Sequence, residues 1–285
     1  MSEKRLRASA PLGEALAGMR KVAVAVLGLW LAAPSLGAAA PGAREILDRR
    51  KALDDTTRKW SDRQEHLKLT IKDARGGERE RELMLYERRL PGDERQTIVF
   101  FESPAEVKGT GFLAYTYKGR PADQWLYLPE LKRIRQITPR SRTESFVGTD
   151  LSYQDLDIIQ EMSSWSESDA RSSLRGEEPV DGVPTYVIEL VPQREDIGYK
   201  KIVLWLGRDD LVPRRIEFYG DGSDPAKRIT QRDLHDVGSI PIAQHIEVET
   251  PARGSRTLIE SANAAFDQHY ADDLFTQRAL ERGQP

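Results

Sequence analysis

The feature that most constrains the fold is an alternation of apolar and polar residues that recurs along the chain. In HLKLTIK, residues 66–72, every second side chain is apolar, which is the pattern of a strand with one buried face. The turn-forming stretch ARGGE follows, then a second strand at residues 81–90, the turn PGDE, and a third strand at residues 95–102. Turns this short join neighbouring antiparallel strands, so the pattern predicts an antiparallel meander.

The same pattern predicts six further strands in the second half of the chain. The turn-forming stretches DGVP, GRDD and DGSDP lie between them. In one of these strands we expect Ile246 and Val248 to face inward and His245, Glu247 and Glu249 to face water. The six strands cover residues 185–192, 200–207, 211–220, 228–237, 244–252 and 256–266.

Two segments have helical character. From residue 43 to about residue 60, apolar side chains recur near a period of 3.6, with charged residues between them and no internal proline or glycine. At the C-terminus we expect a short helix within residues 272–282, with Asp272 and Asp273 as its capping residues.

Residues 104–165 are less regular than the rest. Taken together, the elements predict a mainly β (α+β) fold: a strongly bent antiparallel sheet or partial barrel with helices packed against one side. We expect a single domain over residues 41–285.

Residues 1–40 have the three parts of a secretory signal peptide. Arg20 and Lys21 precede the apolar run VAVAVLGLWLAAPSLG, and three small residues, Ala38 to Ala40, close the segment. We therefore expect export and cleavage near these alanines.

A membrane anchor is the alternative interpretation of this apolar run. Pro34 and Gly37 interrupt it, and it is short for crossing a bilayer, so cleavage is favoured. Met19 directly precedes Arg20 and is an alternative start, which would place residues 1–18 upstream of the protein.

The charge of the chain argues against nucleic acid as a partner. The formal net charge is −3, but residues 1–40 carry five basic and two acidic residues, a net of +3, so the remainder carries −6. Nucleic-acid binding depends on neutralising phosphates, which an acidic protein does poorly. The chain has no cysteine, which excludes disulfides, thiolate metal sites and a lipid-modified cysteine.

Sequence motifs for catalysis are missing. The four histidines form no H-E-x-x-H or H-x-H pair, and neither a G-x-S-x-G elbow nor a Gly-rich phosphate loop is present. Asp150, Asp155 and Asp157 are candidate calcium ligands, but their spacing does not match an EF-hand, and helix capping or a solvated loop explains them better. We expect no enzyme, no metal and no cofactor; a hydrolase built on two carboxylates is the weakest of our hypotheses, because such a pair needs no local motif.

Aromatic residues are concentrated in the irregular middle of the chain. From the residues alone, an ordinary sheet core is favoured over the lining of an apolar ligand cavity, because aromatic residues prefer strands. The residues in question are Phe112, Tyr115, Tyr117, Trp125, Tyr127, Phe146, Tyr153 and Trp165.

The irregular middle of the chain also contains five basic residues, within residues 132–142, with no acidic residue among them. They are candidates for contact with a lipid phosphate or an acidic partner. The alternative, favoured by residue counting, is a solvated outer strand that its charges protect from aggregation. The five are Lys132, Arg133, Arg135, Arg140 and Arg142.

The segment that joins these two groups predicts a hairpin. Leu131, Ile134 and Ile137 are spaced as in an amphipathic helix, but the stretch is short for one. We expect QWLYLP to form one strand, Pro129 and Glu130 the turn, and KRIRQI the return strand.

Three stretches resemble the LolA-like family of outer-membrane lipoprotein-sorting proteins. The family pattern of a W-x-Y-L-P segment, a basic strand and an F-G-D-Y-D run is similar to QWLYLPELKRIRQI followed by SFVGTDLSYQDLD. IVLWLGRDDLVPRRIEFY and LFTQRALER resemble the tryptophan-bearing hairpin and the C-terminal ending of the family. The resemblance spans residue 43 to the end. In the first stretch it rests on Trp125, Tyr127, Leu128, Pro129, Arg133, Arg135, Phe146, Gly148, Asp150, Tyr153 and Asp155.

The resemblance implies a LolA/LolB-like half-open antiparallel β-barrel closed by helices around an apolar cavity. It also implies a periplasmic, monomeric carrier of lipid or lipoprotein acyl chains that serves outer-membrane biogenesis with an RND- or MMPL-type exporter. This shifts the interpretation of the eight aromatic residues from core towards cavity. The second hypothesis is a non-catalytic adaptor that docks on the exporter through Lys132, Arg133 and Arg135 and has no ligand of its own.

Overall fold

The computed structural model describes residues 41–284. The expected signal peptide, its cleavage point and the alternative start all lie outside these residues. None of the helices within residues 41–284 has the length and apolar character needed to cross a membrane.

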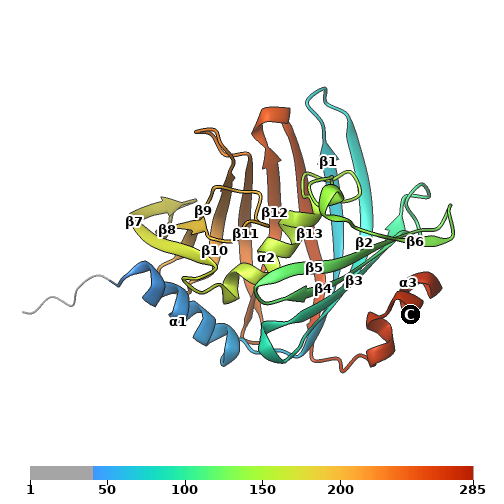
Figure 1. Ribbon diagram of the computed structural model, residues 1–285, viewed down its shortest axis with the longest axis horizontal. Helices are drawn as coiled ribbons and strands as arrows, with labels where there is room; N and C mark the ends of the chain where they lie inside the picture. Colours follow the sequence, from blue (N-terminus) through green and yellow to red (C-terminus); the bar gives the residue numbers. More distant parts are fainter. Residues whose placement is uncertain (1–40, 285) are drawn as a thin grey trace, which may run out of the picture. The chain divides into compact units, whose positions relative to one another are not determined.

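The strands form one continuous, strongly curved antiparallel sheet (Figure 1). Their spatial order is β6-β5-β4-β3-β2-β1-β13-β12-β11-β10-β9-β8-β7. Two meanders therefore meet in the middle of the sheet, where the first strand pairs with the last. The strands are β1 (Asp62–Lys72), β2 (Glu78–Arg89), β3 (Arg95–Ser103), β4 (Gly111–Tyr117), β5 (Arg120–Leu128), β6 (Arg133–Gln136), β7 (Ala170–Val180), β8 (Val183–Pro192), β9 (Lys201–Gly207), β10 (Pro213–Tyr219), β11 (Lys227–Val237), β12 (Ile240–Thr250) and β13 (Ser255–Phe266).

Three helices accompany the sheet. They are α1 (Ala43–Asp55), α2 (Tyr153–Glu161) and α3 (Gln277–Arg282). The segment between β6 and β7, which contains α2, crosses the hollow of the sheet (Figure 1). We call the face that packs against α1 and α2 the inner face and the opposite one the outer face.

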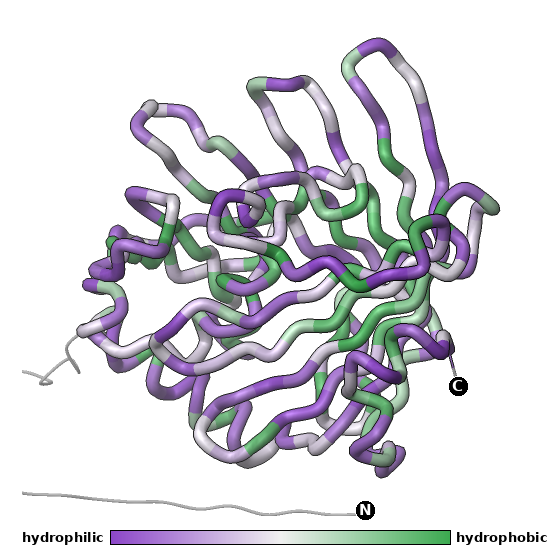
Figure 2. The backbone as a smooth tube through the Cα atoms, turned by 45° about the vertical axis from the view of Figure 1, so that its right-hand side comes forward, coloured by the Kyte–Doolittle hydropathy of each residue, from purple (hydrophilic) through white to green (hydrophobic). Residues whose placement is uncertain are grey.

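The main core lies on the inner face. Alternate residues of the strands, such as Leu69, Leu83 and Val99, pack there with Ile46 of α1 and Ile158 of α2. In Figure 2 the tips of the upper hairpins are hydrophilic, while hydrophobic residues lie deeper in the strands. The period-two pattern of the sequence thus places one row of most strands in this core.

The outer face has a smaller core under the C-terminal segment. A 3₁₀ turn over Asp272–Phe275 and helix α3 pack Phe275 and Leu280 against Ile98, Phe100 and Leu113. The hydroxyl of Tyr115 donates to the backbone oxygen of Phe275 at 2.7 Å, which fixes the segment on the sheet.

Most sequence predictions of elements are confirmed. All nine strands predicted from alternation are present, and Ile246 and Val248 belong to the inner core. The β5–β6 hairpin is confirmed as well: Leu128 pairs with Arg133 across a turn of four residues.

Three predictions about elements need correction. Helix α1 ends at Asp55 rather than near residue 60, because two threonines follow and the hydroxyl of Thr56 bonds to the backbone oxygen of Ala52 at 2.6 Å. The cap of α3 is Thr276, whose hydroxyl accepts from the Ala279 amide at 3.1 Å, and not Asp272 or Asp273. In addition, the alternation did not reveal β4, which is apolar on both faces, or β7, a mostly polar strand at the edge.

Candidate functional site

An apolar cavity of about 90 Å³ lies on the inner face, between the sheet and the segment 146–161. We call residues 146–161 the lid segment. The cavity is smaller than the roughly 300–1,000 Å³ of typical ligand pockets. Its walls come from β1, β2, β3, β4, β13 and the lid segment: Leu67, Leu69, Leu83, Leu85, Thr97, Val99, Phe112, Phe146, Thr149, Leu151, Leu156, Gln160 and Ile259.

The polar groups in this lining bond to one another or to backbone. The Gln160 side chain accepts from Thr116 at 2.7 Å and donates to Thr97 at 3.1 Å. The Thr149 hydroxyl donates to the backbone oxygen of Phe146 at 2.8 Å. Because these groups are already paired, the cavity presents a hydrocarbon surface to its interior.

Buried aspartates attach the lid segment to the sheet. Asp155 forms a capping box with Ser152 at the start of α2, and it also accepts from the Tyr199 hydroxyl at 2.5 Å and from Lys227. Asp150 accepts from Thr257 at 2.9 Å and from Ser255 at 2.5 Å. Hydrogen bonds from these hydroxyls outweigh the effect of burial and lower the pKa of Asp150.

The third aspartate, Asp157, accepts from the Ala122 amide at 3.0 Å and pairs with Arg142 at 3.2 Å. Asp150, Asp155 and Asp157 were the candidate calcium ligands. Protein donors bind at least one oxygen of each carboxylate, although Oδ1 of Asp157 has no partner among residues 41–284, and these bonds attach the lid segment to the rest of the protein. The capping expectation is confirmed for Asp155, whereas none of the three is a solvated loop residue.

The last residue of α2, Glu161, is the most perturbed carboxyl of the lid segment. It is 2% exposed and pairs with Arg194 at 2.8 Å. Burial raises the pKa of Glu161 to about 7, despite the nearby guanidinium. The end of the lid segment therefore titrates near neutral pH.

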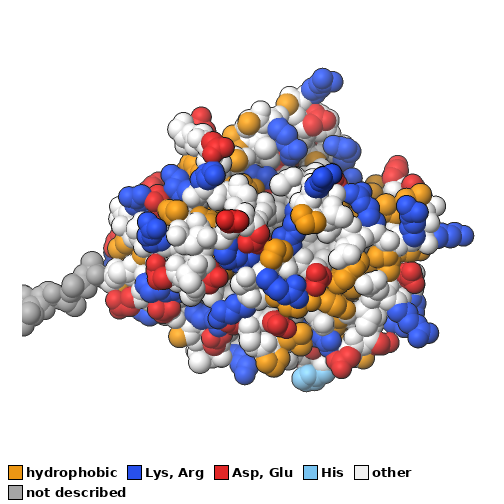
Figure 3. Space-filling model, viewed as in Figure 1, with side chains coloured by type: hydrophobic (Ala, Val, Ile, Leu, Met, Phe, Trp, Pro, Cys, Tyr) orange, Lys and Arg blue, Asp and Glu red, His pale blue; other side chains and the backbone are white. Residues whose placement is uncertain are grey.

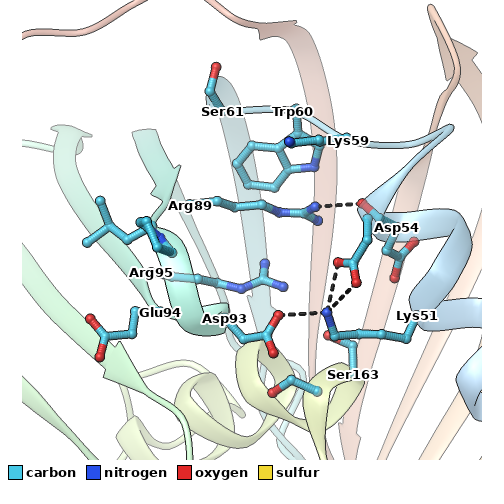
Figure 4. A pocket seen from close by; sticks show the side chains of 14 residues that line it. Lys51, Asp54, Lys59, Trp60, Ser61, Arg89, Asp93, Glu94, Arg95 and Ser163 are labelled. Carbon is cyan, nitrogen blue, oxygen red and sulfur yellow. Dashed lines mark hydrogen bonds and ion pairs between the residues drawn. The ribbon is translucent and has the colours of Figure 1, made fainter.

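Paired charges line a groove beside α1 (Figure 4). The groove has a volume of about 390 Å³, and in it Lys51 bridges Asp55 and Asp93 at 2.6 and 2.7 Å. Arg89 donates to the backbone oxygen of Asp54 at 3.0 Å, and its guanidinium lies 4.1 Å from the ring centre of Trp60.

Glu87 is the buried anion of this region. Burial opposes its ionisation, but the guanidiniums of Arg63 and Arg95, at 2.8 and 2.9 Å, lower the pKa of Glu87 to about 2. The pairing of Arg63 and Arg95 with this buried carboxylate suits a structural role better than a binding site.

The eight aromatic candidates do not form one lining. Phe112 and Phe146 line the cavity and stack edge to face, with ring centres 5.1 Å apart, while Tyr153 and Trp165 are buried in the inner core beyond it. The other four lie on the outer face or outside the cavity: Tyr115, Trp125 and Tyr127 against the C-terminal segment, and Tyr117 beside Arg120.

The five basic candidates also separate. Lys132, Arg133 and Arg140 are exposed, at the β5–β6 turn, on edge strand β6 and in the loop that follows. Arg135 reaches Ser141 at 2.8 Å. Arg142 is 8% exposed and donates to the backbone oxygen of Ala122 at 2.7 Å, so its guanidinium belongs to the interior and is not available to a partner.

One group of side chains on the outer face could hold a metal ion. His66, Glu82 and Glu102 come from three neighbouring strands, and one ligand atom of each lies within 4.8 Å of the others. His66 pairs with Glu102 at 3.2 Å. Sequence spacing does not reveal this group, because strand pairing alone brings it together.

Sequence reasoning missed the aliphatic residues that form most of the cavity wall. Leu67 and Leu69 of β1 and Leu83 and Leu85 of β2 lie on the inner rows of two strands that alternation did predict. The alternation of apolar and polar residues shows that these leucines face inward, but it does not distinguish a cavity wall from a filled core.

The comparisons with known proteins agree with this architecture. A family model described as "Uncharacterized protein" matches residues 93–282. None of the curated proteins compared matches the chain. A crystal structure described as an outer membrane lipoprotein-sorting protein domain from Vibrio parahaemolyticus is 27% identical, with a TM-score of 0.76, and the match covers 84% of this chain and 98% of that one.

Two further crystal structures are similar. A DUF1329 family protein from Desulfovibrio piger is 25% identical with a TM-score of 0.76, and the match covers 84% of this chain and 100% of that one. A LolA superfamily protein from Nitrosomonas europaea, 19% identical with the same coverage, has a TM-score of 0.62 and shows the common fold. The chain therefore belongs to the family that the matching model describes, and it has the LolA-like fold of the outer membrane lipoprotein-sorting protein domain and the DUF1329 family protein.

Proposed function

We propose that this protein is a non-catalytic periplasmic carrier that shields the acyl chains of a lipid or lipoprotein in the cavity beneath the lid segment. The observation that carries the proposal is the hydrocarbon lining of that cavity. The three polar side chains of the lining already have hydrogen-bond partners, so they do not require a polar ligand. The kinship with a lipoprotein-sorting domain supports the same function.

The size of the cavity requires the lid segment to move when a chain enters. About 90 Å³ is the volume of roughly three water molecules in the liquid, far less than a fatty acyl chain needs. Burying about twelve methylenes would contribute roughly 10 kcal/mol. Each lid hydrogen bond exchanged for water costs only about 1 kcal/mol net, or about 1.5–3 kcal/mol where a charge is involved. The gain is large enough to open several of them.

A cavity-filling pair of variants tests the proposal. Leu85 faces the cavity, and its neighbour Met84 faces the outer core, so Leu85→Phe and Met84→Phe add similar bulk on opposite sides of β2. We expect Leu85→Phe to weaken binding of a fluorescent fatty acid about tenfold, with Met84→Phe close to the parent. The measurement is a fluorescence titration of the protein after its signal peptide has been removed.

Organic extraction of the purified protein gives a second readout, because a carrier should retain copurifying lipid. A parent protein that yields no lipid and binds no acyl probe would refute the carrier function. Equal loss of binding in the two variants would place the ligand elsewhere.

The adaptor function is the second candidate, and the edge strand β6 favours it. Lys132 and Arg133 are exposed beside an unpaired strand edge, a surface suited to an acidic partner. Replacing Lys132, Arg133 and Arg135 by glutamate should abolish capture of the exporter in a pull-down and leave acyl-probe binding unchanged. Unchanged capture would remove the support for this candidate.

A further inference from the structure

Two arginines lie at the open rim of the cavity. In the pairing of β1 with β2, Leu69 is opposite Arg81 and Ile71 is opposite Arg79. Arg79 and Arg81 share the inner row of β2 with cavity residue Leu83, and steps along that row are about 7 Å. The row therefore changes from hydrocarbon to cation at the position where the cavity ends. We call Arg79 and Arg81 the rim arginines.

Arg81 is half-buried, and its guanidinium is partly shielded from solvent. Its Nε and Nη1 are shielded from solvent and donate to no acceptor among residues 41–284. Its Nη2 lies close to Gly148 of the lid segment, where a Cβ would approach to 3.3 Å. Burial, together with the guanidinium of Arg79, lowers the pKa of Arg81; Glu106 has the opposite effect but forms no ion pair with it. Unpaired buried N–H groups of this kind are costly.

A groove of about 390 Å³ adjoins the rim arginines. Its lining includes Arg75, Arg79 and Arg253, with Gly148 and Asp150 of the lid segment. In Figure 3 Lys and Arg side chains are prominent on the hairpins at this upper end.

The acidic residues of the groove are already occupied. Asp73 accepts from the amides of Arg75 and Gly77, each at 2.9 Å, and Asp150 accepts from Ser255, Thr257 and Arg253. Neither carboxylate is within ion-pair distance of a rim arginine in the part of the chain that the structure describes. With four basic side chains against two carboxylates, the lining of the groove carries a net positive charge.

The two charged regions of the molecule differ in this respect. Beside α1, Arg63 and Arg95 are held by the buried carboxylate of Glu87. At the rim, Glu106 and Asp73 act on Arg81 and Arg79 only from beyond ion-pair distance, and neither arginine forms an ion pair within residues 41–284. A planar guanidinium binds phosphate or carboxylate through two parallel hydrogen bonds, which is the geometry that an anionic headgroup offers.

We propose that the rim arginines bind the anionic headgroup, phosphate or carboxylate, of an amphiphile whose acyl chain occupies the cavity. This inference rests on the carrier function proposed above and names the class of ligand: anionic, with a hydrocarbon chain. The headgroup supplies the acceptors that Arg81 lacks, and the chain enters past Leu69 and Leu83.

Matched probes separate the headgroup from the chain. Dodecyl phosphate and dodecanol share a chain, as do a fluorescent fatty acid and its methyl ester. We expect the parent to bind each anionic probe about 10- to 100-fold more tightly than its neutral counterpart. The double variant Arg79→Gln/Arg81→Gln should lose this preference and keep its affinity for the neutral probes. The control Arg133→Gln, which changes an exposed arginine of β6, should retain the preference. Thermal unfolding of each variant checks that it is folded.

The outcomes distinguish the two proposals. If neither member of a probe pair binds to the parent, the carrier function fails. If both bind and the double variant keeps the anionic preference, the rim arginines are not the headgroup site and the inference fails alone. Inorganic phosphate gives the third arm: binding as tight as that of dodecyl phosphate would show a site for free anions and would also overturn the inference.

Discussion

Leu69 and Arg81 lie opposite each other on neighbouring strands, the first in the wall of an apolar cavity and the second at its rim. The boundary between hydrocarbon and charge thus runs across one strand pair. An amphiphile has the same boundary between its chain and its headgroup, so the pair fixes both where such a ligand would lie and in which direction.

The first prediction concerns the stability of the ligand-free protein. Arg81→Met keeps an unbranched side chain as far as the ε position and removes the two buried nitrogens that have no partner. We expect the free energy of unfolding in urea to stay the same or rise by about 1 kcal/mol. A loss of more than about 2 kcal/mol would mean that Arg81 has a structural partner.

The second prediction concerns the attachment of the lid segment. Asp155→Ala removes the capping box of α2 and leaves Lys227, which is 15% exposed, without its anion. We expect a loss of roughly 3–5 kcal/mol in urea unfolding, because breaking a buried pair leaves an uncompensated charge. Asp123→Ala is the control, since Asp123 is 38% exposed and pairs with exposed Arg120; its effect should stay below about 1 kcal/mol.

The third prediction concerns pH. The pKa of Glu161 is raised in the folded protein, from 4.5 to about 7, so the folded state holds this proton more tightly than the unfolded state. Its contribution therefore favours folding below pH 4.5 and is lost as the pH rises to about 7, a change on the order of 3 kcal/mol. Glu161→Gln does not titrate. Urea unfolding between pH 4.5 and 7.5 should be less pH-dependent in this variant than in the parent.

An unchanged slope for Glu161→Gln would mean that another group is responsible. If the prediction holds, the attachment of the lid segment weakens as the pH rises towards neutral, which would make acyl-probe binding faster at pH 7.5 than at pH 5. Stopped-flow mixing of the parent and the variant measures this difference.

The sequence predicts features that lie within a single strand. It does not predict features that depend on contacts between several strands. Strands with one polar face, such as the β11–β12 pair, are evident from alternation. Strand β4 is not, because the C-terminal segment covers its outer face and makes both of its faces apolar. The C-terminal segment also accounts for the position of Trp125 and Tyr127, which pack beneath it and not around the cavity.

The site shows the same limit. Alternation puts Arg79 and Arg81 on the inner row of β2, a signal that the sequence contains. Only the approach of Gly148, from a loop far along the chain, shows that the guanidinium of Arg81 is partly covered by the lid segment. Likewise, His66, Glu82 and Glu102 converge through strand register and not through spacing. Long-range pairing of this kind is what a single sequence does not specify.

The last prediction concerns the C-terminal segment, whose Leu280 is fully buried against the outer face. A Cβ on Gly111 would lie 2.7 Å from the Cδ1 of Leu280, so β4 has glycine where the leucine needs room. Gly111→Ala should lower the free energy of unfolding by about 1–3 kcal/mol through overpacking. Leu280→Ala should lower it by roughly 2–5 kcal/mol through loss of burial and the resulting cavity.

The double variant tests the contact itself. In Gly111→Ala/Leu280→Ala the new methyl group occupies space that the leucine has left, so its cost should be smaller than the sum of the two single costs by about 1 kcal/mol or more. Additive losses would show that Leu280 does not pack on Gly111. Because the segment covers the outer face and the cavity lies on the inner one, acyl-probe binding by folded Leu280→Ala should match the parent, which separates the role of the C-terminal segment in stability from the binding function of the sheet.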